Sequence, residues 1–205
     1  NAWGDPFWWP GRDAWEVAAG AVLTQNTSWK NVVRALANLE QRGWTTASSV
    51  SNADSDELGD AIRPSRYYNM KTRKLHELAD WWVRRVDSGE VKRLSDDVVR
   101  SELLNIWGVG EETADAIACY ALGRPFMTVD AYTIRIAMRV FGKRKTPTYS
   151  ELQRQIMNEL PRDTMLLNHF HGLLDVLGHH LCTLKNPGCY ECPLSTHCKS
   201  SRVAR

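Results

Sequence analysis

Apolar residues recur at intervals of three and four along most of the chain, which is the pattern of helices that bury one face. The stretch from Asn69 to Val86 shows this clearly, because Leu75, Leu78 and Trp82 fall on a single face. No segment alternates between apolar and polar residues in the way of a half-buried strand. The pattern therefore predicts an all-α fold with roughly nine or ten helices.

Residues that favour helix ends bound these segments. Asp13, Ser28, Asp54 and Ser95 stand where N-caps are expected, and Thr148 with Glu151 has the spacing of a capping box. Glycines or prolines follow several of the runs and stop them. The expected helices cover residues 14–24, 28–42, 54–63, 69–86, 95–105, 111–122, 130–141, 148–160 and 163–181.

Composition narrows the class of protein only a little. The chain has 205 residues, of which 43% are apolar, enough for one domain or two small ones around a shared cleft. It lacks the run of about 18 apolar residues that a membrane-spanning helix needs. The net charge of +2 is too small to indicate nucleic-acid binding by itself. Basic residues gather in segments 63–74 and 139–145, where solvated helix faces are the favoured interpretation.

The most specific pattern lies near the C-terminus, where four cysteines have the spacing C-x6-C-x2-C-x5-C: Cys182, Cys189, Cys192 and Cys198. Four thiolates this close in sequence can converge on one metal centre. Pro187, Gly188 and Pro193 supply turns. The spacing favours a [4Fe-4S] cluster.

Zinc and disulfides are the alternatives to the cluster. Zinc also accepts four thiolates, but its sites usually pair two short C-x2-4-C knuckles, and only one gap is short here. Disulfides fit less well because Cys119, in an apolar helical stretch, makes the cysteine count odd.

Two further motifs precede the cysteines. A Gly108-Val109-Gly110 turn joins two expected helices, and its free N–H groups at a helix start could hold a DNA phosphate. An ordinary glycine turn between helices explains it as well. Asp130 starts the next helix, where an N-cap is the simplest interpretation.

The order of these motifs, from about Asp13 to Cys198, resembles the helix–hairpin–helix–Gly/Pro–Asp superfamily of endonuclease III-like DNA glycosylases. The resemblance implies two helical domains around a DNA-binding cleft. Residues 25–124 would form a six-helix barrel domain, with the helix–hairpin–helix at residues 95–123. Residues 1–24 and 125–205 would form a discontinuous cluster domain, with the [4Fe-4S] loop at residues 182–198.

The same resemblance implies a catalytic role for Asp130 on a nucleotide flipped into the cleft. Its carboxylate would stabilise the positive charge that develops on the sugar, or position the attacking water. Bifunctional members of the superfamily carry a lysine in the motif G-V-G-x-K, and this lysine forms a Schiff base. Glu112 occupies that position here, so the sequence predicts a monofunctional hydrolase.

A narrower resemblance concerns the substrate. Four segments are similar to the bacterial 3-methyladenine DNA glycosylases of the endonuclease III branch: Phe7–Pro10, Val22–Trp29, Ile62–Asn69 and Glu111–Asp115. This similarity implies that Trp8, Trp9, Pro10 and Trp29 stack on the extruded purine. An N-terminal arm that plugs the barrel is the alternative for the first three residues. One known member of that branch lacks the cluster, so this chain would be a cluster-bearing relative.

Three more DNA contacts follow from the resemblance. Gln25 would fill the gap left by the flipped base, and Tyr67 matches the second wedge position. Either residue could instead cap or pack within its loop. Lys185, between the first two cysteines, would reach a phosphate if the cluster holds its loop rigid.

The sequence as a whole predicts a base-excision DNA glycosylase that removes alkylated purines from double-stranded DNA. One alternative is an endonuclease III-like enzyme for oxidised pyrimidines or mismatched bases, with weak or no lyase activity. The other is a catalytically silent protein that binds DNA structures. We expect a monomer without membrane association, in the cytoplasm of a prokaryote at the nucleoid.

Overall fold

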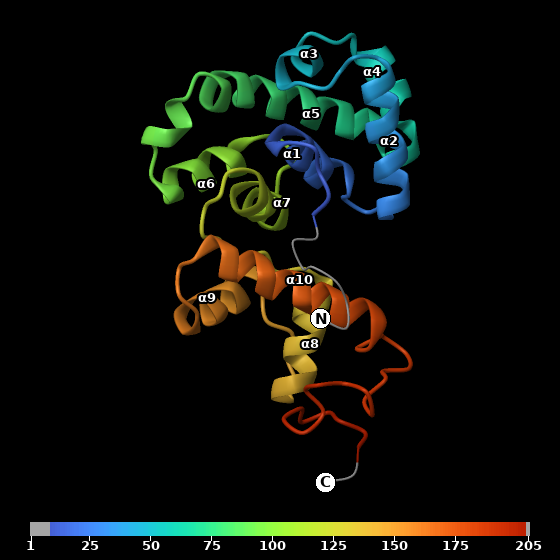
Figure 1. Cartoon of the computed structure of the whole chain (residues 1–205), viewed down its shortest axis with the longest axis vertical. Helices are drawn as coiled ribbons and strands as arrows, with labels where there is room; N and C mark the ends of the chain where they lie inside the picture. The colour runs from blue at the N-terminus through green and yellow to red at the C-terminus, as the bar shows by residue number, and fades with distance from the viewer. Residues whose placement is uncertain (1–8, 204–205) are drawn as a thin grey trace. The chain divides into compact units, whose positions relative to one another are not determined.

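The computed structural model describes residues 9–203, and these residues form helices and loops without a β-strand. The expected all-α fold is therefore confirmed for this part of the chain. Contacts between residues divide it into two compact units. The larger unit is Trp9–Arg124 and the smaller one begins at Pro125 (Figure 1).

The larger unit contains seven α-helices together with short 3-10 and π segments. In order, these are α1 (Ala14–Leu23), α2 (Trp29–Gln41), α3 (Ala47–Ser51), α4 (Ser55–Ile62), η1 (Arg63–Ser65), α5 (Tyr68–Trp82), η2 (Val83–Asp87), η3 (Glu90–Arg93), α6 (Asp96–Asn105), α7 (Glu111–Ala116) and η4 (Ile117–Ala121).

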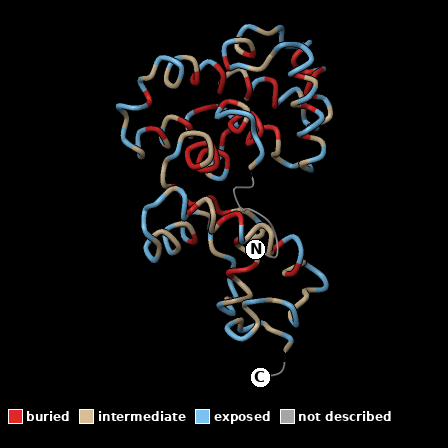
Figure 2. Tube along the Cα trace, in the orientation of Figure 1, coloured by how far each residue is buried: buried red, intermediate tan, exposed pale blue. Residues whose placement is uncertain are grey.

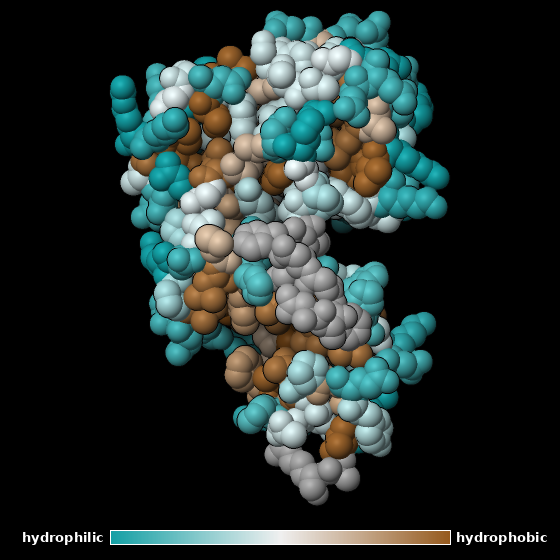
Figure 3. Space-filling model, viewed as in Figure 1, coloured by the Kyte–Doolittle hydropathy of each residue, from teal (hydrophilic) through white to brown (hydrophobic). Residues whose placement is uncertain are grey.

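Helix α1 lies at the centre of this unit and contacts α2, α5, α7 and η4. It is built mainly from small and apolar residues, and Ala18, Val22 and Leu23 are fully buried. A helix that is apolar on every side needs neighbours all around it, which explains its position. Figure 2 shows buried residues concentrated along α1 and α7, and Figure 3 shows a hydrophobic patch beside hydrophilic residues in the region of α2.

The smaller unit is built from α8 (Ala131–Phe141), α9 (Tyr149–Glu159) and α10 (Thr164–His180), followed by the cysteine loop. Its core includes Met127, Val129 and Leu152, all at most 2% exposed. Partly buried apolar side chains of α9 and α10 pack on this core. The loop has few buried residues, so packing alone gives it little stability (Figure 2).

Most helix boundaries agree with the capping residues seen in the sequence. The side chains of Asp13, Asp54 and Ser95 accept backbone hydrogen bonds at their helix starts, and Thr148 with Glu151 forms the capping box. Ser28 precedes α2 but makes no capping bond through its side chain. Helix α3, which the apolar pattern did not predict, begins with a second capping box at Thr46.

The contacts of α1 differ from the domain assignment expected from the resemblance. Residues 1–24 were expected to belong with residues 125–205, whereas α1 packs among the helices of the unit Trp9–Arg124. The apolar surface on all sides of α1 is the physical reason, because the surrounding helices bury it.

No helix in the described residues is both long and apolar enough to span a membrane.

Candidate functional site

Asp130 is the N-cap of α8. Its backbone is extended, and its carboxylate accepts a hydrogen bond of 2.7 Å from the backbone N–H of Thr133. The side chain remains 17% exposed. The sequence-based interpretation as an N-cap is therefore correct, and the bond leaves acceptor capacity on the carboxylate.

Two titratable side chains of α10 lie near Asp130. The Nε2 atom of His171 is 3.8 Å from the Asp130 carboxylate, and burial lowers the pKa of this imidazole, which Asp130 partly offsets. Burial also raises the pKa of Asp175 to about 6, helped by the charge of Asp130 and opposed by His179. The sequence showed His171 without a companion pattern, because only the fold brings it to Asp130.

The Gly-Val-Gly hairpin joins α6 to α7 as expected. Gly108 has a φ of +75°, a conformation that favours glycine, and a Cβ there would lie 2.3 Å from Cε of Lys74 and displace that side chain. Gly110 is the N-cap of α7 and has no atoms near the position of a Cβ. Val109 is buried and anchors the turn between the glycines. The turn thus presents open backbone at Gly110.

Glu112 lies in the first turn of α7 and is exposed. Three residues further along α7, the fully buried Asp115 accepts bonds of 2.6 and 3.0 Å from the guanidinium of Arg100 on α6. This bidentate pair fixes the two helices of the hairpin against each other. The hairpin is therefore a rigid unit whose outer face carries a carboxylate at position 112.

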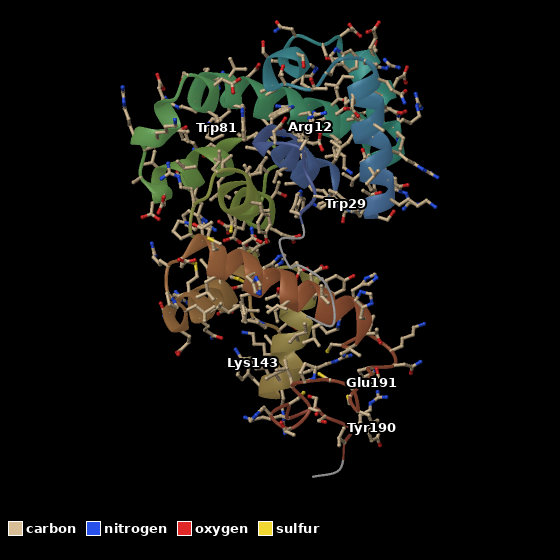
Figure 4. The ribbon with its side chains drawn as sticks, viewed as in Figure 1. Arg12, Trp29, Trp81, Lys143, Tyr190 and Glu191 are labelled. Carbon is tan, nitrogen blue, oxygen red and sulfur yellow. The ribbon has the colours of Figure 1, made fainter. Side chains whose placement is uncertain are left out.

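Two of the expected base-pocket residues meet in the larger unit. The rings of Trp9 and Trp29 are 5.6 Å apart in an edge-to-face arrangement, and both lie against Gly20 of α1. Figure 4 shows Trp29 at the start of α2. Trp9 also stacks on Tyr120 with the ring centroids 5.4 Å apart. Tyr120 was missed, because a single aromatic residue in an apolar helix gives no signal of a site.

The remaining two residues of the expected pocket are not part of this cluster. Pro10 is exposed. Trp8 lies outside the described residues.

Gln25 and Tyr67 lie in two loops that line one hollow of about 290 Å³, together with Asn26, Met70, Lys71 and Lys74. Tyr67 is 63% exposed. The Gln25 amide donates to the Thr113 hydroxyl at 2.8 Å and to the Gly108 carbonyl at 3.3 Å, and its oxygen accepts from Lys74. Gln25 is therefore bound to the hairpin in this state, and it would have to exchange these bonds to fill a gap in DNA.

The four cysteines of the C-terminal motif line a single cavity of about 250 Å³. All are half-buried free thiols. Burial raises the pKa of the Cys192 thiol, as do the other three cysteines nearby. Cys119 is separate: it is buried in the larger unit, where burial and then Asp115 raise its pKa to about 12. The odd cysteine is thus an inert core thiol.

Two arginines of α8 hold the cysteine loop. Arg139 donates to Sγ of Cys182 at 3.2 Å, to the Thr183 carbonyl at 2.8 Å and to the Leu184 carbonyl at 2.9 Å. Arg135 donates to the Cys182 carbonyl at 2.8 Å. The sequence analysis interpreted Arg139 as part of a solvated basic face, and that interpretation is wrong. One helix thus connects Asp130, at its start, to the loop that carries Lys185.

Lys185 itself is exposed, as is Tyr190 between the second and third cysteines (Figure 4). The described residues contain no group of three or more His, Cys, Asp or Glu side chains that is arranged to hold one metal ion. A single zinc ion requires its four sulfurs about 4 Å apart, as Zn–S bonds of 2.3 Å dictate. In a [4Fe-4S] cluster each thiolate binds a different iron, so the sulfurs stand further apart around a shared cavity. The four cysteines line one cavity, so they could supply the thiolate donors that a [4Fe-4S] cluster needs.

The chain belongs to the superfamily described as HhH-GPD base excision DNA repair proteins, whose model matches residues 19–162. This match includes Trp29, the hairpin and Asp130, whereas Trp9 precedes it. Members of this superfamily are DNA N-glycosylases, and the chain is an enzyme of that class.

Two relatives show how broad the similarity is. A protein of Methanocaldococcus jannaschii named as a DNA repair glycosylase is 37% identical over 201 residues, which is 97% of this chain and 91% of the relative. An endonuclease III of Thermotoga maritima is 30% identical over 190 residues, or 93% and 84% of the two chains.

A solved structure is also similar. It is the H. pylori 3-methyladenine DNA glycosylase bound to 1,N6-ethenoadenine, with a TM-score of 0.72 and 26% identity. The match covers 85% of this chain and 88% of that one.

Proposed function

We propose that this protein is a monofunctional DNA glycosylase that hydrolyses the N-glycosidic bond of N-alkylated purines in double-stranded DNA. The observation that best supports hydrolysis is the geometry of the Asp130 carboxylate. The Thr133 N–H fixes it at the start of α8, and it is partly exposed. A carboxylate fixed in this way stabilises the cationic sugar without reorganising as the bond breaks. In this role Asp130 would also orient the attacking water.

The absence of a lysine at position 112 supports a hydrolase without lyase activity. Glu112 stands where the bifunctional members of the superfamily carry the Schiff-base lysine, and a carboxylate cannot form that bond. We therefore expect the products to be a free base and an intact abasic strand.

The preference for alkylated purines rests on charge and on the aromatic cluster. A purine methylated at N3 or N7 is a cation and leaves without being protonated, so the enzyme needs only to hold it and stabilise the sugar. An indole face attracts a desolvated cationic ring by about 1–2 kcal/mol. Trp9 and Trp29 supply such faces, and the similar 3-methyladenine glycosylase supports the assignment. Trp8 and Pro10 remain candidates for the same pocket.

A second candidate function is favoured by the similarity to the T. maritima endonuclease III. It is a glycosylase for oxidised pyrimidines or mismatched bases with weak or no lyase activity. A silent DNA-binding protein is the least supported candidate, because Asp130 is present and positioned.

We also propose that Cys182, Cys189, Cys192 and Cys198 hold a [4Fe-4S] cluster with a structural role. The cavity that all four thiols line supports it, as does the hydrogen bond from the Arg139 guanidinium that holds Sγ of Cys182 in place. When bound, the cluster would fix the loop so that Lys185 can contact a DNA phosphate. The hairpin glycines Gly108 and Gly110 would hold a second phosphate. We expect a monomer in the prokaryotic cytoplasm.

A panel of duplexes tests the proposed function. Each duplex carries one lesion: 3-methyladenine, 7-methylguanine, thymine glycol, uracil or 8-oxoguanine. We expect release of the methylated purines, little release of the others, and strand cleavage only after alkali. Excision of thymine glycol without 3-methyladenine would support the endonuclease III-like alternative, and tight binding without any excision would support the silent binder.

A further inference from the structure

A buried lysine connects the two loops that line the hollow around Gln25 and Tyr67. Lys71, on the first turn of α5, is only 2% exposed. Its ammonium group donates a hydrogen bond of 2.7 Å to the Leu23 carbonyl, the last residue of α1. It donates a second bond of 2.6 Å to the Ser65 carbonyl, the last residue of η1. One side chain thus joins the ends of two elements that are far apart in the sequence.

The backbone that follows each of these carbonyls is strained. Asn26, Arg66 and Tyr67 have φ values of +54°, +62° and +47°, and they are the only non-glycine residues with positive φ in the described part of the chain. Such conformations cost free energy and persist only when the surroundings impose them. All three occur within three residues of a carbonyl that Lys71 binds. The strain is therefore concentrated where Lys71 fixes the backbone.

The burial of a lysine without a carboxylate partner is itself costly. Burial and then the neighbouring charge of Lys74 lower the pKa of Lys71 to about 8. An apolar residue of similar length would avoid this cost if packing were its only task. The carbonyls at the C-terminal ends of α1 and η1 carry partial negative charge, which gives the ammonium a specific task there.

We propose that Lys71 is a positioning residue that holds the α1–α2 loop (residues 24–28) and the η1–α5 loop (residues 66–67) in the geometry needed to open the DNA stack. Gln25 and Tyr67 would then enter the duplex from two loops at a fixed separation. Lys71 does not touch the substrate. This role rests on the proposed function, because it assumes that these loops separate a damaged base from its neighbours.

If Lys71 has this role, its substitution should slow base release from a paired duplex more than from one that is already open. Extruding a base from a paired duplex requires unstacking and unpairing, whereas a lesion in a single-nucleotide bulge is already partly open. Loops that are misplaced should therefore impair the paired substrate much more than the bulged one. A loss of folded protein would instead reduce both rates by the same factor.

The test compares single-turnover release of 3-methyladenine from these two duplexes by the wild-type protein, Lys71→Met and Lys92→Met. Lys92 is an exposed lysine of η3 and serves as the matched control. Because a small misplacement of positioning groups can cost up to about a hundredfold in rate, we expect Lys71→Met to lose at least about tenfold on the paired duplex. On the bulged duplex we expect a loss below about threefold, and Lys92→Met should match the wild type on both.

An equal loss on both duplexes, or no loss on either, would overturn this role while leaving the proposed function intact. No release by the wild type from either duplex would overturn the proposed function, and with it the role of Lys71. If Lys71→Met does not fold, Lys71→Gln takes its place, since glutamine retains N–H donors but is shorter than lysine and carries no charge. We expect Lys71→Gln to show the same selective loss on the paired duplex, smaller in size. If this variant shows no selective loss, the proposal is also rejected.

Discussion

At the scale of the residue, the carboxylate of Asp130 is held by the start of α8, where the Thr133 N–H donates to it at 2.7 Å. Substitution by asparagine keeps an oxygen that can cap the helix but removes the charge. We expect Asp130→Asn to fold normally and to lose at least about a hundredfold in base release, which corresponds to about 3 kcal/mol of lost stabilisation of the transition state. Binding to abasic DNA should survive.

The matched control is Asp163→Asn. Asp163 is an exposed N-cap of α10 and accepts from the Leu166 N–H at 2.8 Å, so the two substitutions make the same chemical change at two helix starts. Wild-type rates are expected for the control. If Asp130→Asn also releases the base at the wild-type rate, Asp130 does not have the role assigned to it.

Asp175 provides a second test at this scale, through pH. Its pKa is raised to about 6 by burial and then by Asp130, above its ordinary value of 3.8. Between these two values the folded state keeps a proton that the unfolded state releases, so this group makes the protein less stable as the pH rises from about 4 to 6. Removing the carboxyl should therefore stabilise the protein above pH 6.

We expect Asp175→Asn to raise the free energy of unfolding at pH 7.5 by about 1 kcal/mol, after a discount for partial exposure. Near pH 4 the gain should largely disappear, because the wild-type carboxyl is then mostly protonated. Urea unfolding at the two pH values measures the difference. An equal change at both values would mean that ionisation of Asp175 is not the cause.

At the scale of the element, α8 connects the candidate catalytic carboxylate to the cysteine loop. Arg139 donates to four acceptors between Cys182 and Leu184, so it replaces the packing that this loop lacks. We expect Arg139→Met to release the loop, speed the loss of cluster absorbance in the presence of a chelator by about fivefold or more, and weaken DNA binding. Arg154→Met, at an exposed position on α9, is the control. Identical decay in both variants would remove Arg139 from this role.

The elements also show what the sequence can and cannot reveal. Helix starts were predictable because Asp13, Asp54, Ser95 and Thr148 act on backbone within three residues of themselves. Helix α3 was missed because five residues are too few to display a period. The endings of α5 and α7 as π segments were missed because neighbouring helices, rather than local sequence, determine them.

The residues of the candidate site also separate into those that the sequence predicts and those that only the fold reveals. The hairpin glycines, Asp130 and the four cysteines are visible in the sequence because each is a local motif with a characteristic spacing. The roles of Lys71, Arg139 and Tyr120 depend on partners distant in the chain, and a lysine or a tyrosine alone carries no signal of such a partner. Even Gln25, which the sequence singled out, was not expected to be bound to Thr113.

At the scale of the whole molecule, the four cysteines predict a metal content. We expect purified protein to be yellow-brown, with about four irons per chain and a broad absorbance near roughly 400 nm. Removing the cluster should weaken DNA binding before it affects the chemistry, because hydrolysis of a glycosidic bond requires no electron transfer. One zinc per chain without iron would contradict this expectation.

The central claim is that the enzyme releases alkylated purines by hydrolysis. The most direct measurement is to incubate the protein with methylated DNA and, separately, with oxidised DNA, and to identify every released base by mass spectrometry while monitoring the strands. This account predicts free 3-methyladenine from the first substrate, no oxidised pyrimidine from the second, and strands that break only after alkali. Release of oxidised pyrimidines without 3-methyladenine, or a protein–DNA adduct trapped in high yield by borohydride, would contradict it.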